Sequence, residues 1–126
     1  MIRVHYNEQK RPPAPFVLVT VVNPLNGSAL TDIPSQFDTA ADRTLVPLPI
    51  LENLGLHPID DIVIGGVGGT EETMPVFAVS LSIHTLPMRT LAVVAHPEEQ
   101  WILLGRDVLN FNRILLDGPN LALEID

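Results

Sequence analysis

The stretch IPSQFDTAADRTLVP, residues 33–47, places two aspartates, Asp38 and Asp42, in a run that is otherwise largely apolar or small. The run has no helix-like apolar face, and it continues into LVP at 45–47, which has the character of a core segment. A carboxylate that leads into a core needs partners or a chemical role, because burying an unpaired charge is costly. The two aspartates are therefore the first candidates for function.

Composition limits the classes of protein to which the chain can belong. With 126 residues it is expected to form one domain, and its 46% of hydrophobic residues excludes a disordered chain. The sequence has no cysteine, which excludes disulfides, thiol catalysis and cysteine-ligated zinc. The formal net charge of −8 argues against nucleic acid or an anionic membrane as a partner. These features favour a globular domain that acts on other ligands.

No targeting segment is expected. The first fifteen residues lack the apolar region of a signal peptide. The longest apolar runs, at 16–22 and 76–83, are too short to span a bilayer. We therefore expect a soluble, cytoplasmic protein.

Twelve prolines and eight glycines divide the sequence into short segments rich in Val, Ile, Leu and Thr, a pattern typical of an all-β domain. We expect strands at 16–22, 28–37, 45–47, 61–64, 71–83, 90–95, 102–104, 114–116 and 121–125, and short helices at 48–54 and 107–111. Gly55 suits the left-handed position that follows a helix. Residues 1–15 are predicted to be an N-terminal arm, either loose or paired with another chain, before a domain at 16–126.

Three short motifs follow one another in a fixed order: DTAADRT from Asp38, IGGVGG from Ile64 and ILLGRD from Ile102. Each alone is weak; the glycine run would suit an ordinary hairpin tip, and it lacks the Lys-Ser/Thr of a phosphate loop. Together the three motifs resemble the retropepsin-like aspartic proteases, the single-domain relatives of the retroviral proteases, and in particular their bacterial-type members. The resemblance covers the chain from Phe16 to its C-terminus.

This resemblance implies a closed or partly open β-barrel of the retropepsin type, with one or two short helices, in a symmetric homodimer. It makes Asp38 the catalytic residue of an aspartic endopeptidase. Such chemistry needs two carboxylates that share a proton, one acting as base toward water while the other polarises the peptide carbonyl. Because the chain has one Asp-Thr motif, the second carboxylate must come from another copy of the chain.

The resemblance also implies roles for the neighbouring residues. It assigns support of the catalytic loop to Thr39, Ala40, Ala41, Asp42 and Arg106, with an ion pair expected between Asp42 and Arg106. It assigns substrate binding to a flap and to pocket residues: Ile64, Gly65, Gly66, Val67, Gly68, Gly69, Leu45, Trp101 and Leu103. For Trp101, ordinary core packing is an equal alternative. The expected ligand is a peptide or protein substrate.

One position departs from the family pattern. The loop of the family usually contains Asp-Thr-Gly, and here the third residue is Ala40. If this residue has a negative φ, alanine adds little beyond its methyl group. The alternative function is a catalytically impaired or inactive dimer of the same fold that acts as a peptide-binding or assembly module.

Other kinds of site find little support. The four histidines show no metal-ligand spacing, so no metal is expected, and the proposed chemistry needs no cofactor. The spacing of Asp38 and Asp42 does not fit an Asp-x-Asp phosphotransfer motif, and there is no Gly-x-Ser-x-Gly nucleophile elbow.

Overall fold

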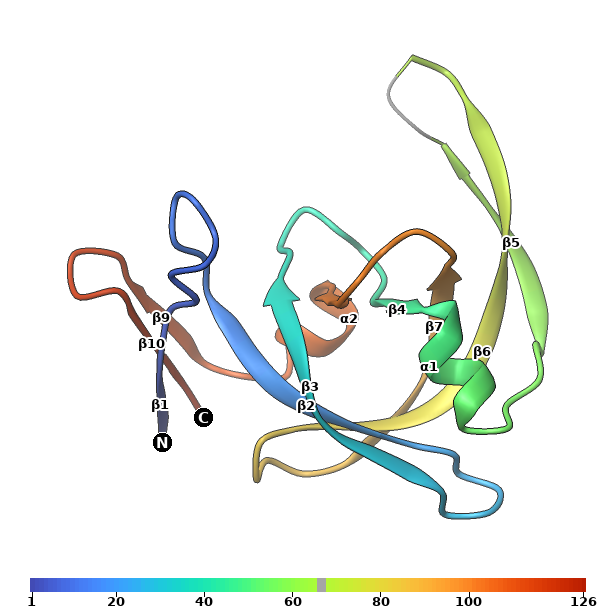
Figure 1. Ribbon diagram of the computed structural model, residues 1–126, viewed down its shortest axis with the longest axis horizontal. Helices are drawn as coiled ribbons and strands as arrows, with labels where there is room; N and C mark the ends of the chain where they lie inside the picture. The colour runs from blue at the N-terminus through green and yellow to red at the C-terminus, as the bar shows by residue number, and fades with distance from the viewer. Residues whose placement is uncertain (66–67) are drawn as a thin grey trace.

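The structure is a computed structural model and describes residues 1–65 and 68–126. Its strands are β1 Ile2–His5, β2 Phe16–Val22, β3 Ala29–Phe37, β4 Leu45–Pro47, β5 Asp60–Gly65, β6 Glu71–Ile83, β7 Arg89–His96, β8 Ile102–Leu104, β9 Ile114–Asp117 and β10 Ala122–Ile125. Its helices are α1 Leu48–Asn53 and α2 Arg106–Leu109. The predicted all-β class with short helices is confirmed (Figure 1).

Six strands close a barrel. They are hydrogen-bonded in the order β2-β3-β8-β4-β7-β6, and β6 pairs back onto β2. Strand β5 pairs with β6 outside this ring, and the β5–β6 hairpin extends beyond the barrel (Figure 1). Closure leaves the barrel strands without open edges, which protects them from pairing with other chains.

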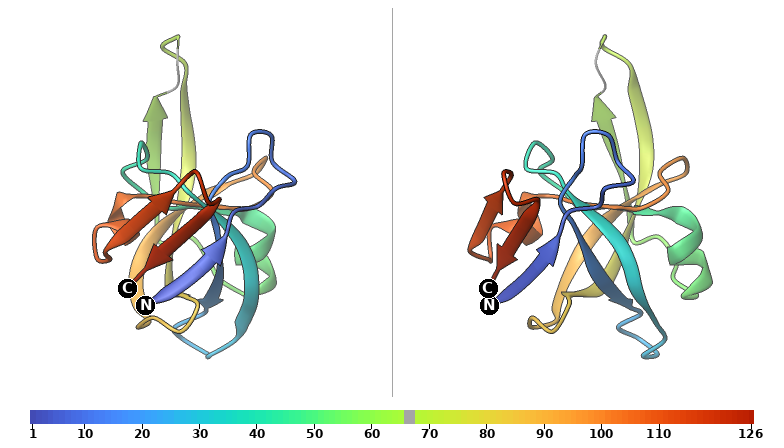
Figure 2. Two further views of the ribbon diagram at one scale, coloured as in Figure 1. Left: turned by 90° about the vertical axis from the view of Figure 1, so that its left-hand side faces the viewer. Right: turned by 60° about the vertical axis from the view of Figure 1, so that its left-hand side comes forward.

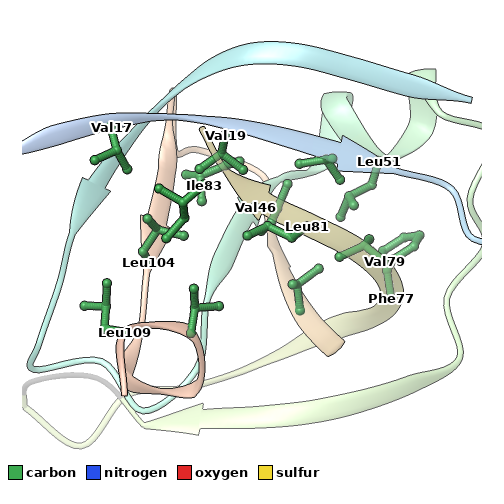
Figure 3. Close-up of a cluster of buried hydrophobic side chains, with 14 of the residues drawn as sticks. Val17, Val19, Val46, Leu51, Phe77, Val79, Leu81, Ile83, Leu104 and Leu109 are labelled. Carbon is green, nitrogen blue, oxygen red and sulfur yellow. The ribbon is translucent and has the colours of Figure 1, made fainter. Parts of the chain in front are cut away.

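The barrel interior holds the main core. Along β2, Val17, Val19 and Val21 are fully buried, because alternate residues of a strand point to the same face. They meet side chains from β6 and β8, such as Phe77 and Leu104 (Figure 3). Burying side chains of this size stabilises the fold by about 2 kcal/mol each.

Helix α1 closes one side of the barrel. A proline in its first turn fits the start of a helix, and Leu51 is its buried anchor. Gly55 follows with φ +72°, as expected for the left-handed position. None of the helices in residues 1–65 and 68–126 is long and apolar enough to cross a membrane.

The two ends of the chain form a second, smaller sheet. Its order is β1-β10-β9, with Ile2 opposite Ile125, so the termini lie side by side (Figure 2). Arg3 Nη1 donates to Glu124 Oε1 at 2.8 Å across the same pair of strands. The start of the N-terminal arm is therefore a strand, because β1 pairs with β10 of its own chain.

Two parallel pairings place the functional segments together. Strand β3 runs parallel to β8, with Phe37 opposite Leu104, and β4 runs parallel to β7. Residues that follow β3 and β8 must therefore emerge at the same end of the barrel. These residues are Asp38, the first residue of the first motif, and Gly105, the residue of the third motif that directly follows β8.

Candidate active site

The loop that begins at Asp38 is shaped by its own backbone. Asp38 N–H donates to Leu104 O at 2.9 Å, which continues the pairing of β3 with β8. Ala41 N–H donates to Asp38 O at 3.2 Å, and Ala40 N–H donates to Asp38 Oδ1 at 3.2 Å. The Asp38 side chain is half-buried, while Thr39 and Ala40 are exposed. The loop thus holds one carboxylate oxygen and presents its tip outward.

A buried hydrogen-bond network fixes the other end of this loop. Thr44 is fully buried and donates from Oγ1 to Asp107 Oδ1 at 2.7 Å and from its backbone N–H to Asp107 Oδ2 at 3.0 Å. Gly105 N–H donates to Thr44 Oγ1 at 3.1 Å, and Val94 N–H donates to Thr44 O at 3.0 Å. Thr44 is therefore hydrogen-bonded to β7, to the residue that follows β8 and to α2. We call Thr44, Gly105 and Asp107 the anchor.

The anchor depends on the close approach of two backbones. A Cβ added at Gly105 would lie 2.5 Å from Arg43 C, 2.7 Å from Arg43 O and 2.9 Å from Thr44 N. Such distances are too short for any side chain, so glycine is required at this position. The φ of Gly105 is −85°, and the requirement is therefore one of space rather than of conformation.

The ion pair expected between Asp42 and Arg106 is absent. Among residues 1–65 and 68–126, the ion pair is Arg3–Glu124, and His5 Nε2 lies 3.0 Å from Glu8 Oε2. Arg106 instead donates from Nη1 to Thr39 O at 2.8 Å, and both Asp42 and Arg106 are exposed. The carboxylate that ties the loop to α2 is Asp107, one residue further on. Helix α2 spans a single turn, so sequence periodicity did not reveal which of its residues faces the loop.

Ala40 fits the backbone of the loop. The non-glycine residues with positive φ in the described part of the chain are Asp32, His84 and Leu121, so Ala40 has an ordinary backbone conformation. A methyl group there therefore introduces no backbone strain. Because Ala40 is exposed, the methyl group lies on the open side of the loop.

The described residues of the glycine-rich motif, Ile64, Gly65, Gly68 and Gly69, lie at the end of the β5–β6 hairpin. Pairing runs up to Gly65 opposite Glu71, and Gly68 and Gly69 have φ values of +91° and +79°. The predicted flap residues Gly66 and Val67 lie outside the described residues. Ile64 is half-buried and packs on a second apolar cluster formed by Met74, Val76 and Val94.

A groove of about 360 Å³ separates this hairpin from the Asp38 loop. It is lined by Ala41, Asp42, Arg43, Leu45, Ile62, Val63, Ile64, Gly65 and Val94. The loop and the hairpin lie at the same end of the barrel, and residues 7–14 of the N-terminal arm reach that end as well (Figures 1 and 2). The structure thus brings the first two sequence motifs to opposite walls of one groove.

The predicted pocket residues lie on the outer face of the barrel wall. Leu45 and Leu103 are half-buried and are opposite one another across β4 and β8. Trp101 packs edge-on against Phe16, with ring centroids 5.7 Å apart. Lys10 Nζ lies 3.2 Å from the centroid of the same indole. Trp101 is therefore held by the N-terminal arm, a contact that the sequence did not reveal.

The sequence pattern of the family described as aspartyl protease matches residues 21–108, which contain Asp38, the glycine-rich motif and Gly105. The chain belongs to the aspartyl protease family. This match covers all three motifs in their predicted order.

Solved structures support the same assignment for the fold. The chain is 21% identical to the simian foamy virus (mac) protease, with a TM-score of 0.56 over 77% of this chain and 93% of that one. It is 22% identical to the EIAV protease in complex with the inhibitor HBY-793, with a TM-score of 0.54 over 86% and 93%. These likenesses show that the aspartyl protease domain has the fold of the retroviral enzymes, as the sequence predicts.

A third structure is much longer than this chain. The foamy viral protease-reverse transcriptase in complex with double-stranded DNA is 15% identical, with a TM-score of 0.55, and the match covers 79% of this chain but 16% of that one. The curated protein sequences contain no significant match to the chain.

Two residues that hold the Asp38 loop, Thr44 and Asp107, were not predicted from the sequence. Thr44 is the last residue of the first motif, and Asp107 is the last residue of the third. The residues predicted to connect the loop with the helix were Asp42 and Arg106 instead. The available signal was the position of Thr44 between an exposed loop and the core segment at 45–47. A hydroxyl entering a core needs a hydrogen-bond partner.

In residues 1–65 and 68–126, no group of three or more His, Cys, Asp or Glu residues is placed to hold a metal ion.

Proposed function

We propose that this chain is an aspartic endopeptidase that acts as a homodimer, with Asp38 of each copy supplying one of two catalytic carboxylates. The observation that carries the proposal is the Asp38 loop: one half-buried carboxylate lies at the end of the barrel, followed by the exposed Thr39 and Ala40. One copy offers one carboxylate, whereas the reaction needs two. A twofold axis that passes beside the exposed loop would bring the second carboxylate to the first.

The chemistry follows from a pair of carboxylates that share one proton. The ionised carboxylate takes a proton from a water molecule as the water oxygen attacks the peptide carbonyl carbon. The other carboxyl group donates its proton to the carbonyl oxygen, which gives a neutral tetrahedral diol. The diol then collapses: its C–N bond breaks as the nitrogen receives a proton from the protonated carboxyl group, and one diol hydroxyl gives its proton to the ionised carboxylate. A carboxylic acid and an amine leave, and the pair again holds one proton. No metal or cofactor takes part in these steps.

The groove offers a way to hold an extended peptide. Strand β5 pairs only with β6 among the described residues, so its other backbone edge is available. Ile62, Val63, Ile64 and Gly65 of this strand line the groove that faces the Asp38 loop. A peptide substrate would add to β5 as a further strand, with main-chain hydrogen bonds giving affinity and side-chain pockets giving selectivity. In the proposal, closure of the hairpin over the peptide excludes water.

The terminal sheet is a second surface suited to contact with another copy. Strand β10 is paired on both sides, so the open edges of this sheet belong to β1 and β9. Strand β9 also exposes two leucines, with 53% of Leu115 and 48% of Leu116 accessible. An open edge that carries exposed leucines is a site where two chains associate. We assign this edge to the subunit contact of the proposed dimer.

Cleavage of a diverse peptide library tests the proposal. Wild-type protein and Asp38→Asn are incubated with the library from about pH 4 to pH 7, and the products are identified by mass spectrometry. Sedimentation of both proteins reports the oligomeric state. We expect dimers in both cases, and cleavage that falls by at least roughly a thousandfold in Asp38→Asn.

Two outcomes would contradict the enzyme proposal. Full activity of a monomer would exclude a mechanism in which each copy supplies one carboxylate. A well-folded dimer that binds peptides but cuts none at any pH would favour the alternative function, a peptide-binding or assembly module. The sequence feature that supports this alternative is Ala40 in place of glycine.

A further inference from the structure

The outer face of the barrel wall carries a continuous row of side chains that begins beside the Asp38 loop. Direct strand partners place these residues side by side on one face of the sheet. In order across the sheet they are Phe16, Gln36, Leu103, Leu45, Val94 and Val76. We call this set the outer row.

Burial shows that the outer row lies opposite the barrel core. Residues next to its members in sequence, such as Val17, Ile102 and Val46, belong to the main core inside the barrel. Val76 and Val94 instead belong to the second cluster, onto which Leu45 and residues of β5 pack. Because neighbouring residues of a strand point to opposite faces, the outer row lies on the face of the sheet that carries the groove, and its members Leu45 and Val94 line that groove.

Gln36 is the one polar side chain in this row. Its strand partners are Phe16, which is 7% exposed, and Leu103, which is half-buried. Gln36 itself is half-buried. Among the hydrogen bonds of residues 1–65 and 68–126, none involves its side-chain amide, although that amide offers two donors and an acceptor. The amide therefore depends on solvent for hydrogen bonds in the unbound protein.

The position of Gln36 relative to the reacting groups is set by the strand. Asp38 lies two residues further along the chain, which corresponds to roughly 7 Å at the rise of a β-strand and returns to the same face. The side chain nearest to the catalytic carboxylate along β3 on this face is thus an amide and not a hydrocarbon. A substrate side chain next to the cleaved bond would cover it.

We infer that Gln36 is a specificity-determining residue that selects an uncharged hydrogen-bonding side chain, an amide or a hydroxyl, next to the cleaved bond. The inference rests on the proposed protease function. An apolar substrate side chain would bury the Gln36 amide without a partner, which costs more than an imperfect apolar contact. A charged side chain would lose its own hydration against Phe16 and Leu103. In a symmetric dimer each copy presents one Gln36, so the preference applies on both sides of the cut.

Binding of two matched inhibitors tests this inference without requiring turnover. The probes are two statine-type peptide mimics that differ only in the side chain beside the hydroxyl group, glutamine in one and methionine, of similar size, in the other. Calorimetry gives Kd values for wild type, Gln36→Leu and Gln9→Leu. Gln9 is exposed in the N-terminal arm, so its variant carries the same chemical change outside the outer row.

We expect wild type and Gln9→Leu to bind the glutamine mimic roughly five- to tenfold more tightly than the methionine mimic, the worth of about one hydrogen bond. Gln36→Leu should lose or reverse that preference. An unchanged preference in Gln36→Leu overturns the inference, as does a wild type that prefers methionine or binds neither mimic. Gln36→Met, which keeps an unbranched side chain, is the second variant if Gln36→Leu does not fold.

Failure of the inference and failure of the proposed function give different results. The same two mimics are measured on Asp38→Asn, and the corresponding cleavable peptides are incubated with wild type. Selective binding without any cleavage supports the role of Gln36 and contradicts the protease proposal. Cleavage that depends on Asp38 but is indifferent to glutamine and methionine supports the protease and contradicts the role of Gln36.

Discussion

The two ends of the loop that runs from Asp38 to Thr44 differ in burial and in hydrogen bonding. Residues 38–42, the Asp38 segment, are exposed or half-buried. Apart from the hydrogen bond from Asp38 N–H to Leu104 O, their hydrogen bonds are local or come from the exposed Arg106. The anchor is different: Thr44 and Gly105 are buried, and Asp107 accepts two hydrogen bonds from Thr44. One short loop thus contains both a weakly held and a tightly held part.

This contrast indicates how the chain positions a carboxylate without covering it. A buried, fully hydrogen-bonded network holds its geometry well, because every polar group in it would lose a partner on moving. The Asp38 segment is fixed at both ends: Asp38 N–H is hydrogen-bonded to Leu104 O, and the anchor holds Thr44. Its middle stays open to solvent. Substitutions in the two parts should therefore have very different costs.

The largest effect on stability is expected from Gly105→Ala. The new methyl group would meet Arg43 C at 2.5 Å, and backbone atoms cannot move aside as a flexible side chain can. We expect the free energy of unfolding to fall by about 3 kcal/mol, at the upper end of overpacking effects. Denaturant unfolding at fixed protein concentration measures this change, because the stability of the proposed dimer would depend on concentration.

Gly118→Ala is the matched control for that substitution. Gly118 lies in the turn between β9 and β10, where a Cβ would meet no atom within 4 Å, and it is not among the glycines with positive φ. We expect a change within about 0.5 kcal/mol. Equal losses at Gly105 and Gly118 would show that the close approach at the anchor carries no special cost.

A smaller loss is expected from Thr44→Val. Valine keeps the shape of the side chain but leaves Gly105 N–H without its acceptor and Asp107 Oδ1 without one donor. We expect the unfolding free energy to fall by about 2 kcal/mol, the cost of leaving buried polar groups unpaired. Denaturant unfolding of wild type and Thr44→Val under the same conditions measures the difference in unfolding free energy.

Arg106→Gln provides the comparison on the exposed side. It removes the 2.8 Å hydrogen bond from Arg106 Nη1 to Thr39 O, which is open to solvent. The expected loss is about 0.5 kcal/mol. If Arg106→Gln costs as much as Thr44→Val, the distinction between a tightly and a weakly held part of the loop is wrong.

A similarly small effect on stability is expected from Ala40→Gly, which restores the usual family residue. Because Ala40 has an ordinary φ, glycine gains nothing in the folded state and adds freedom to the unfolded chain. We expect stability to fall by about 0.5 kcal/mol. Peptide cleavage should stay within roughly threefold of wild type, since one exposed methyl group is removed. An inactive wild type that gains cleavage on Ala40→Gly would identify this methyl group as the cause of impairment.

Much of the barrel could be predicted from local sequence. The strands at 16–22, 45–47 and 102–104 have the predicted limits, because runs of Val, Leu and Ile there end at proline, glycine or asparagine. The glycine after α1 has the predicted left-handed conformation. These features depend on residues within a few positions of one another, where turn chemistry and alternation are informative.

The features that sequence did not reveal depend on distant pairing. Arg3 lies 121 residues from Glu124, and no local pattern indicates that β1 pairs with β10 rather than with another chain. The choice between Arg106 and Asp107 as the loop contact had a similar cause, since one helical turn defines no face. Gln36 was visible as an isolated amide, but its role depends on which residues of β2 and β8 lie beside it.

The pairing of Ile2 with Ile125 has a consequence for the order of folding. Hairpins such as β5–β6 and β6–β7 close short loops and can form early, whereas the terminal sheet must bring together the two ends of the whole chain. Closing so large a loop in an unfolded chain costs conformational entropy. Once the barrel has formed, most of the chain between the two ends is already ordered, so the remaining cost of pairing the ends is small. The terminal sheet is thus expected to form last. If its open edge joins two copies, assembly would follow completion of the barrel, and a partly folded chain would not carry the paired carboxylates.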